Sequence, residues 1–168
     1  MRDVRSFPFR RAVRHLPIGT RGQALVEFAL VAPVFFLLLF AVIEGGRFIL
    51  YYETLANATR EGARYGIVHG WKSYCPSGPM PPGEAIPVTC YDATGAKVVQ
   101  RVKDSAFGLL GTTVIVTPLW LGTDGVSPGN NGRDNTMKVT ASYTYRTIIP
   151  LPLPPITMSA ESSLVINN

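Results

Sequence analysis

The first strong pattern in the chain is a continuous run of apolar residues near the N-terminus. Phe28 to Ile43 is sixteen residues long and contains no charged side chain. Extending the run back to Gln23 gives twenty-one residues with one ionisable group, Glu27. A helix of that length spans about 31 Å, the thickness of a bilayer core, and it is apolar on every side, unlike the helix of a soluble protein. The sequence therefore predicts one transmembrane helix over residues 23–45.

Helical periodicity continues beyond this run. Phe48, Tyr52 and Leu55 recur at intervals of three and four residues, so the helix is expected to extend over residues 23–68. Prolines exclude a helix from residues 70–91.

Two local features of this helix lead to separate predictions. Tyr51 and Tyr52 lie about one turn beyond the apolar run, where an aromatic belt at the membrane surface is expected. Glu61 and Arg64 are three residues apart and can pair on the helix surface.

A second, amphipathic helix is predicted over Thr94–Leu110. Its apolar residues recur on one face, and they are Val98, Val99, Val102, Ala106, Phe107 and Leu110. Thr94 is the expected N-cap, and Gly111 is expected to end the helix.

Three strands are predicted in the C-terminal part. Residues 112–120 are rich in β-branched side chains, and residues 139–146 and 156–166 alternate between apolar and polar with a period of two. Asp-Gly, Pro-Gly and Asn-Gly pairs make residues 122–136 a long turn, and prolines stiffen residues 150–155. Strands this close in sequence form an antiparallel meander most simply, with the helices covering its apolar face. The predicted fold class is α+β.

The positive charge is confined to one segment. The net charge is +5, and residues 1–22 hold six of the sixteen basic residues with one acid, whereas the remainder has ten of each sign. An excess of arginine on one side of a membrane helix marks the cytoplasmic side, and a neutral remainder argues against a nucleic-acid-binding face. We therefore expect residues 1–22 to be a cytoplasmic leader, residues 23–45 to cross the inner (cytoplasmic) membrane once, and residues 46–168 to be an extracytoplasmic domain.

The apolar run does not resemble the core of a cleaved secretory signal peptide. The run is followed directly by Glu44-Gly45-Gly46-Arg47, and the first pair of small residues in the A-x-A pattern is Ala56 and Ala58. Because signal cleavage requires small residues close behind the apolar core, the segment is expected to remain as an anchor.

Glu27 is the unusual residue of the anchor. A carboxylate in an apolar helix is costly unless it is paired or lies at the membrane surface, and a snorkelling interfacial side chain is one interpretation. The other starts from Gly22: cleavage after this glycine would give Gln23 a free amine, with Glu27 as the fifth residue of the mature chain. That carboxylate could then pair with the amine of a neighbouring chain inside the membrane.

The segment around these residues resembles a known family. RGQALVEF, residues 21–28, is similar to the processing site of type IV pilin-like proteins, and residues 21–66, including NATREGARYG at residues 57–66, resemble the TadE family of the tight-adherence (Flp) pilus system. The resemblance implies a minor pilin, or pseudopilin, with a pilin-like domain on a long N-terminal helix, which assists pilus assembly or a related secretion system.

The resemblance also implies site residues and partners. Gly22 and Gln23 would form the junction cut by a prepilin peptidase, and Glu27 would be the assembly carboxylate. The implied partners are the lipid bilayer, other pilin-like subunits, the prepilin peptidase and the pilus assembly platform. The leader of 22 residues is longer than in some members of the family.

The remaining candidate chemistry is sparse. Cys75 and Cys90 flank the proline-rich loop, and in an oxidising compartment they favour one disulfide over two free thiols. Two histidines, His15 and His69, are too few and too far apart for a zinc site, and no catalytic or nucleotide-binding motif is present. We expect no metal, no cofactor, no nucleic-acid partner and no enzymatic activity. The main alternative to a pilin is an uncleaved, signal-anchored extracytoplasmic binding or scaffold module.

Overall fold

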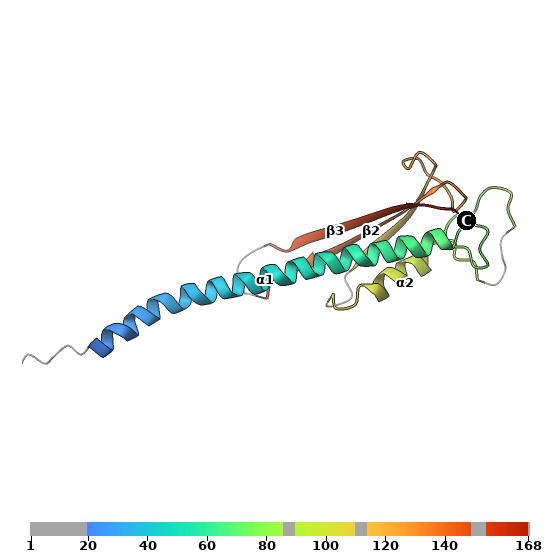
Figure 1. The fold of residues 1–168 in the computed structure, drawn as a ribbon. Coiled ribbons are helices and arrows are strands. Elements are labelled where there is room, and N and C mark those ends of the chain that lie inside the picture. The colour runs from blue at the N-terminus through green and yellow to red at the C-terminus, as the bar shows by residue number, and fades with distance from the viewer. Residues whose placement is uncertain (1–19, 86–89, 110–113, 149–153, 168) are drawn as a thin grey trace, which may run out of the picture. The chain divides into compact units, whose positions relative to one another are not determined.

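The computed structural model describes residues 20–85, 90–109, 114–148 and 154–167. Helix α1 (Thr20–Val68) comes first and is followed by the shorter helix α2 (Ala96–Ser105). Strands β1 (Ile115–Leu121), β2 (Thr136–Tyr145) and β3 (Ile156–Val165) complete the chain (Figure 1). Most of the predicted leader, residues 1–19, lies outside the described residues.

The chain divides into two compact units, Met1–Phe40 and Ala41–Asn168. The described part of the first unit is the apolar beginning of α1. The second unit contains the rest of α1, helix α2 and the three strands. The elements of the described chain confirm the predicted α+β class, with a long apolar N-terminal helix, a second helix and an antiparallel sheet of three strands.

The sheet is a meander with the order β1-β2-β3 and antiparallel pairing throughout. Its register places Trp120 opposite Met137 and Ala141 opposite Ala160, so the buried residues of the three strands share one face. The opposite face carries mainly polar side chains. One ion pair on it, Lys138 Nζ to Glu161 Oε1 at 2.7 Å, links β2 to β3. This one-sided burial produces the period of two that the sequence displays.

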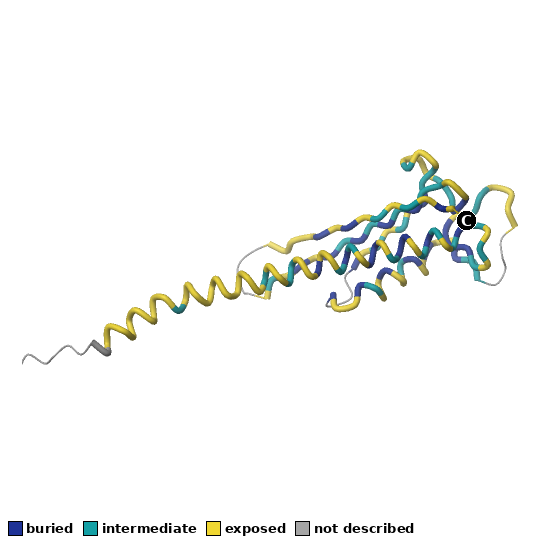
Figure 2. Tube along the Cα trace, in the orientation of Figure 1, coloured by how far each residue is buried: buried dark blue, intermediate teal, exposed yellow. Residues whose placement is uncertain are grey.

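The second half of α1 and helix α2 cover the buried face of the sheet (Figures 1 and 2). Tyr51 contacts the rings of Tyr143 and Tyr145 edge-on, at centroid distances of 5.8 and 5.7 Å. Leu55 on α1 and Val102 on α2 are completely buried in the same core. Apolar burial of this kind is the main source of folding free energy in so small a unit.

The expectations for α1 need two corrections. Tyr51 is a core residue, because the sheet extends far enough along the helix to cover it, whereas Tyr52 is exposed and its place in an aromatic belt stays a prediction. Glu61 pairs with Arg101 of α2 at 2.8 Å, and not with Arg64, because α2 packs alongside α1 at that turn.

Helix α2 is shorter than predicted. It begins at Ala96, so Thr94 is not its N-cap, and Gly95 adopts a left-handed φ of 74° before the first turn. At the other end the helix stops at Ser105, and Phe107 is exposed instead of facing the core. Gly108, with a φ of 90°, takes the chain out of the helical path. The predicted end at Gly111 lies outside the described residues.

The strands lie close to their predicted positions. β1 starts at Ile115 and ends at Leu121, while part of its predicted start, residues 112–113, falls outside the described residues. β2 begins three residues earlier than the alternation suggests, at Thr136, and β3 matches its predicted start at Ile156. The turn predicted over residues 122–136 connects β1 to β2.

Candidate functional site

The three residues predicted to direct processing and assembly lie in the first turns of α1. The helix begins at Thr20, so Gly22 and Gln23 are already helical, and both are exposed. A Cβ atom added to Gly22 would meet nothing within 4 Å. The Gln23 side-chain amide donates a hydrogen bond of 3.5 Å to Glu27 Oε1, four residues later on the same face. The junction and the carboxylate are therefore neighbours on an open helix surface.

The part of α1 that follows is apolar on all sides. Its large side chains from Leu25 to Ile43 are exposed, as the yellow first half of the helix in Figure 2 shows. Pro33 lies within the helix without ending it, although it cannot donate a backbone hydrogen bond. Among the described residues, one helix is long and apolar enough to cross a membrane, and it lies near the N-terminus. This indicates a single-pass membrane protein.

Farther along α1, two glycines let the sheet and α2 approach the helix backbone. A Cβ atom at Gly62 would overlap the side chain of Val102 on α2, and one at Gly66 would lie 2.8 Å from Met137 Cγ on β2. Ala63 between them is completely buried. The segment NATREGARYG therefore presents a small-residue face to the core, with Arg60 exposed to solvent.

A polar cluster at Glu44 was not predicted from the sequence. The Glu44 carboxylate accepts hydrogen bonds from the Tyr145 hydroxyl at 2.6 Å, from Arg47 Nη1 at 3.0 Å and from the Ile148 backbone N–H at 3.2 Å. Arg47 also lies 5.4 Å from the centroid of the Tyr51 ring and 5.6 Å from that of Tyr145. The cluster fastens the end of β2 to α1, immediately after the apolar run.

The burial of Tyr145 has an electrostatic consequence. Burial of the phenol, together with its hydrogen bond to the Glu44 carboxylate, raises the pKa of Tyr145 to about 12. The hydroxyl therefore remains a proton donor at every physiological pH. The only sequence signal for this cluster was the charged residue at the end of the apolar run, which does not reveal its partner.

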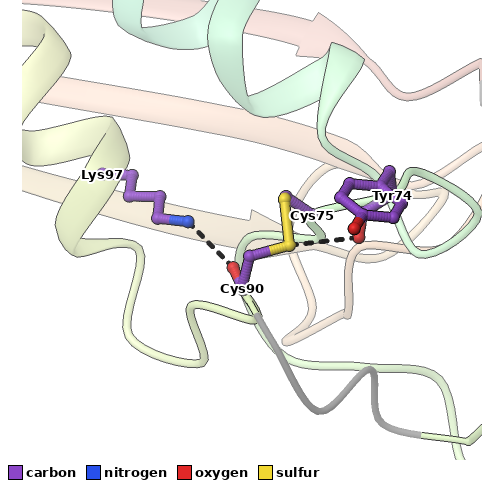
Figure 3. The surroundings of a disulfide bond; sticks show 4 residues. All are labelled: Tyr74, Cys75, Cys90 and Lys97. Carbon is purple, nitrogen blue, oxygen red and sulfur yellow. Dashed lines mark hydrogen bonds between the residues drawn. A yellow bond between two sulfur atoms is a disulfide. The ribbon is translucent and has the colours of Figure 1, made fainter.

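The loop between the two helices is joined covalently and by hydrogen bonds. Cys75 and Cys90 form a disulfide with a Cα–Cα distance of 5.1 Å (Figure 3). Lys97 Nζ donates a hydrogen bond of 2.8 Å to the Cys90 carbonyl, and the Tyr74 carbonyl oxygen lies 3.2 Å from Cys90 Sγ. These contacts attach the loop to the beginning of α2.

Asp92 links the same loop to α2. Its carboxylate accepts hydrogen bonds from the backbone N–H groups of Ala96 at 3.0 Å and Lys97 at 2.8 Å, which are unpaired donors of the first turn. It also accepts bonds from the hydroxyls of Ser77 and Thr94, each at 3.1 Å. Burial acts to raise the pKa of Asp92, but these four hydrogen bonds outweigh it and hold the pKa below its ordinary value.

The described residues do not gather groups suited to acid–base or metal chemistry. Within these residues no cluster of three or more histidine, cysteine, aspartate or glutamate side chains could hold a metal ion. His69 stacks on Tyr65 at a centroid distance of 3.8 Å, and its Nδ1 lies 2.9 Å from the Tyr65 carbonyl oxygen. That arrangement is a local contact at the end of α1. The absence of enzymatic activity and of cofactors stays a prediction.

Of the comparisons with known proteins, one gives a match. No match was found among curated proteins or among solved structures. A match to a family, described as TadE-like protein, covers residues 22–64, from the predicted junction to the small-residue face of α1. The resemblance seen in the sequence is therefore confirmed, and residues 22–64 of this membrane protein are TadE-like.

Proposed function

We propose that this chain is a minor pilin, or pseudopilin, that assists assembly of a tight-adherence (Flp-type) pilus or a related secretion system. The observation that carries the proposal is the position of Glu27, a lone carboxylate on the apolar part of α1, five residues after Gly22. The TadE-like match, which suggests involvement in Tad pilus assembly, begins at the same glycine.

Processing is the first step of the proposed function. A prepilin peptidase hydrolyses the bond between Gly22 and Gln23 and releases the leader, residues 1–22. Both residues are exposed, but they lie in the first turns of α1, so this end of the helix must unwind locally before a peptidase can bind the bond. The cut creates a positively charged amine on Gln23.

Assembly then uses that amine. Two unit charges about 4 Å apart attract each other by about 4 kcal/mol at an effective dielectric constant of 20, and by less in water. The Glu27 carboxylate of one subunit binds the Gln23 amine of the next, which fixes the register between two apolar helices. Exposed side chains from Leu25 to Ile43 supply the surface on which those helices and the surrounding lipid pack.

The proposed membrane topology follows from the distribution of basic residues along the chain. The arginine-rich leader stays in the cytoplasm, residues 23–45 span the inner membrane, and residues 46–168 lie outside. The disulfide between Cys75 and Cys90 agrees with an oxidising compartment for that domain. In this position the domain faces other pilin-like subunits and the assembly platform, and it has no catalytic role.

Intact mass and N-terminal sequencing of protein recovered from membranes test the processing step. We expect a mature chain that begins at Gln23. A start upstream of Gln23, with the leader retained, would support the alternative of an uncleaved, signal-anchored binding or scaffold module.

The assembly step is tested by Glu27→Ala and by the isosteric Glu27→Gln. Both variants should insert into the membrane as well as the wild type, yet surface pili should fall at least tenfold, because the charge pair is lost. Glu53→Ala is the matched control, since Glu53 is an exposed acid of the same helix beyond the apolar run. Normal piliation with both Glu27 variants would refute the role of the carboxylate.

A further inference from the structure

An open cleft in the unit Ala41–Asn168 has no role in the function proposed above. Its volume is about 520 Å³. Helix α1 and the end of β2 form its walls, and the lining residues are Arg47, Tyr51, Tyr143, Thr144, Arg146, Thr147 and Ile148. Two guanidinium groups thus line one cleft together with aromatic and hydroxyl side chains.

The two arginines differ in their surroundings. Arg47 is held in place by Glu44 at 3.0 Å and by the Tyr51 hydroxyl at 3.4 Å. Arg146 is exposed, and within the described part of the chain it forms no hydrogen bond or ion pair. Glu44 balances one of the two positive charges, so the cleft retains the charge of the other. Its chemistry favours an anion with several acceptor oxygens.

The position of the cleft along the chain indicates where such an anion would come from. Arg47 follows Ile43, the last residue of the apolar run, by four residues, or about 6 Å along a helix. The backbone N–H of Ile148 is bound to Glu44, which keeps Ile148 close to the same point of α1. Its side chain is nevertheless 70% exposed.

Other exposed apolar side chains lie at the same end of the sheet. The register pairs Ile156 with Tyr145 and Ile115 with Ser142, and both isoleucines are exposed. The two side chains lie on opposite faces of the sheet, since residues 142 and 145 of β2 point to opposite sides. Exposed apolar side chains at the end of the domain that carries basic groups are typical of a protein surface that contacts lipid headgroups and the adjoining acyl chains.

We propose that this cleft binds the phosphate of an anionic phospholipid from the bilayer that α1 crosses. Arg47 and Arg146 donate hydrogen bonds to the phosphate oxygens, and Ile148 contacts the glycerol and upper acyl region of the same lipid. The inference goes beyond the pilin role. It requires the membrane span but neither cleavage at Gly22 nor pairing by Glu27.

Native mass spectrometry of the full-length protein in detergent tests the proposal, with phosphatidylglycerol as the titrated lipid. Arg146→Gln is the variant and Arg133→Gln the matched control. Arg133 is also an exposed arginine, but it precedes β2, whereas Arg146 follows it, so the ten residues of the strand separate them by about 33 Å. Both changes remove one positive charge, and near-ultraviolet circular dichroism verifies that both variants remain folded.

We expect Arg146→Gln to weaken binding of the first lipid about tenfold, which is the effect of losing one charged hydrogen bond, while Arg133→Gln binds as the wild type does. Equal lipid retention in all three proteins would overturn the proposal, and so would equal losses in both variants, which would indicate net charge alone. A parallel titration uses inorganic phosphate as competitor. Displacement of the lipid at comparable concentrations would assign the cleft to a free anion and not to a lipid.

Discussion

At the scale of single residues, Asp92 shows how one side chain can organise a loop and a helix together. Its two carboxylate oxygens accept four hydrogen bonds, two from the first turn of α2 and two from hydroxyl groups of the loop. Because the residue is buried, water cannot replace these partners. Removal of the charge should therefore cost more than the loss of an ordinary surface cap.

We predict that Asp92→Asn lowers the free energy of unfolding by about 1–2 kcal/mol at neutral pH, since an amide cannot accept all four bonds. Urea unfolding of the full chain in detergent, followed by circular dichroism, measures this change. Asp104→Asn is the control, because Asp104 is exposed and accepts one hydrogen bond, from Gln100 on the helix surface. Equal losses in both variants would contradict the assigned role.

The same variant has a predictable pH dependence. The pKa of Asp92 is lower in the folded chain than in the unfolded chain, so the folded state binds fewer protons. Its stabilisation is complete above the unfolded value of about 3.9 and is lost as the pH falls through the folded value. The difference in stability between wild type and Asp92→Asn should therefore begin to shrink as the pH falls below about 4 and continue to shrink toward the folded pKa. A difference that stayed constant down to pH 2 would exclude the carboxylate as its source.

At the scale of the element, α1 combines two helical surfaces with opposite requirements for side-chain size. Its first part exposes large apolar side chains, whereas its last turns present small residues to the core. Gly62 shows the second requirement, because Val102 of α2 occupies the space where a Cβ atom would lie. Val102 is β-branched and completely buried, so it has little freedom to move away.

Gly62→Ala should therefore destabilise the protein although alanine favours helices. The gain in helix propensity is about 1 kcal/mol, and overpacking in a filled core costs about 1–3 kcal/mol. Thermal unfolding in detergent should show a lower midpoint for Gly62→Ala. Gly46→Ala provides the contrast, since a Cβ there meets nothing within 4 Å and should leave the midpoint unchanged or raise it. In a Val102→Ala background the penalty of Gly62→Ala should disappear, and its persistence would show that Val102 is not the obstacle.

At the scale of the whole molecule, the elements could be predicted because each is marked by a local pattern. The apolar run located α1, and the alternation around Val139 located β2, since burial on one face of a sheet repeats every second residue. The contacts between elements could not be predicted. Glu61 pairs with Arg101 and not with its near neighbour, because tertiary packing decides between the two cations. The same limit explains why the start of α2 was predicted wrongly, because the carboxylate that caps its first turn belongs to a residue outside the helix.

The candidate sites differ in the same way: some are visible in the sequence, and others depend on contacts between elements. Gly22, Gln23 and Glu27 were identified because their spacing is visible in the chain itself. The cluster at Glu44 was not, because its partner Tyr145 is 101 residues away and only the packing of α1 against β2 brings them together. Arg146 carries no distinctive sequence signal, since its significance depends on the cleft that it shares with Arg47.

The bond between Cys75 and Cys90 also determines what happens to a chain that is cut. Glu84 lies between the two cysteines, exposed and outside any helix or strand, whereas the other described glutamates belong to α1 or β3. A glutamate-specific protease should therefore nick the folded protein first after Glu84. The two fragments would migrate as one band on a non-reducing gel and separate only when a reductant is added. If they separated without reductant, the fragments would not be joined by this bond.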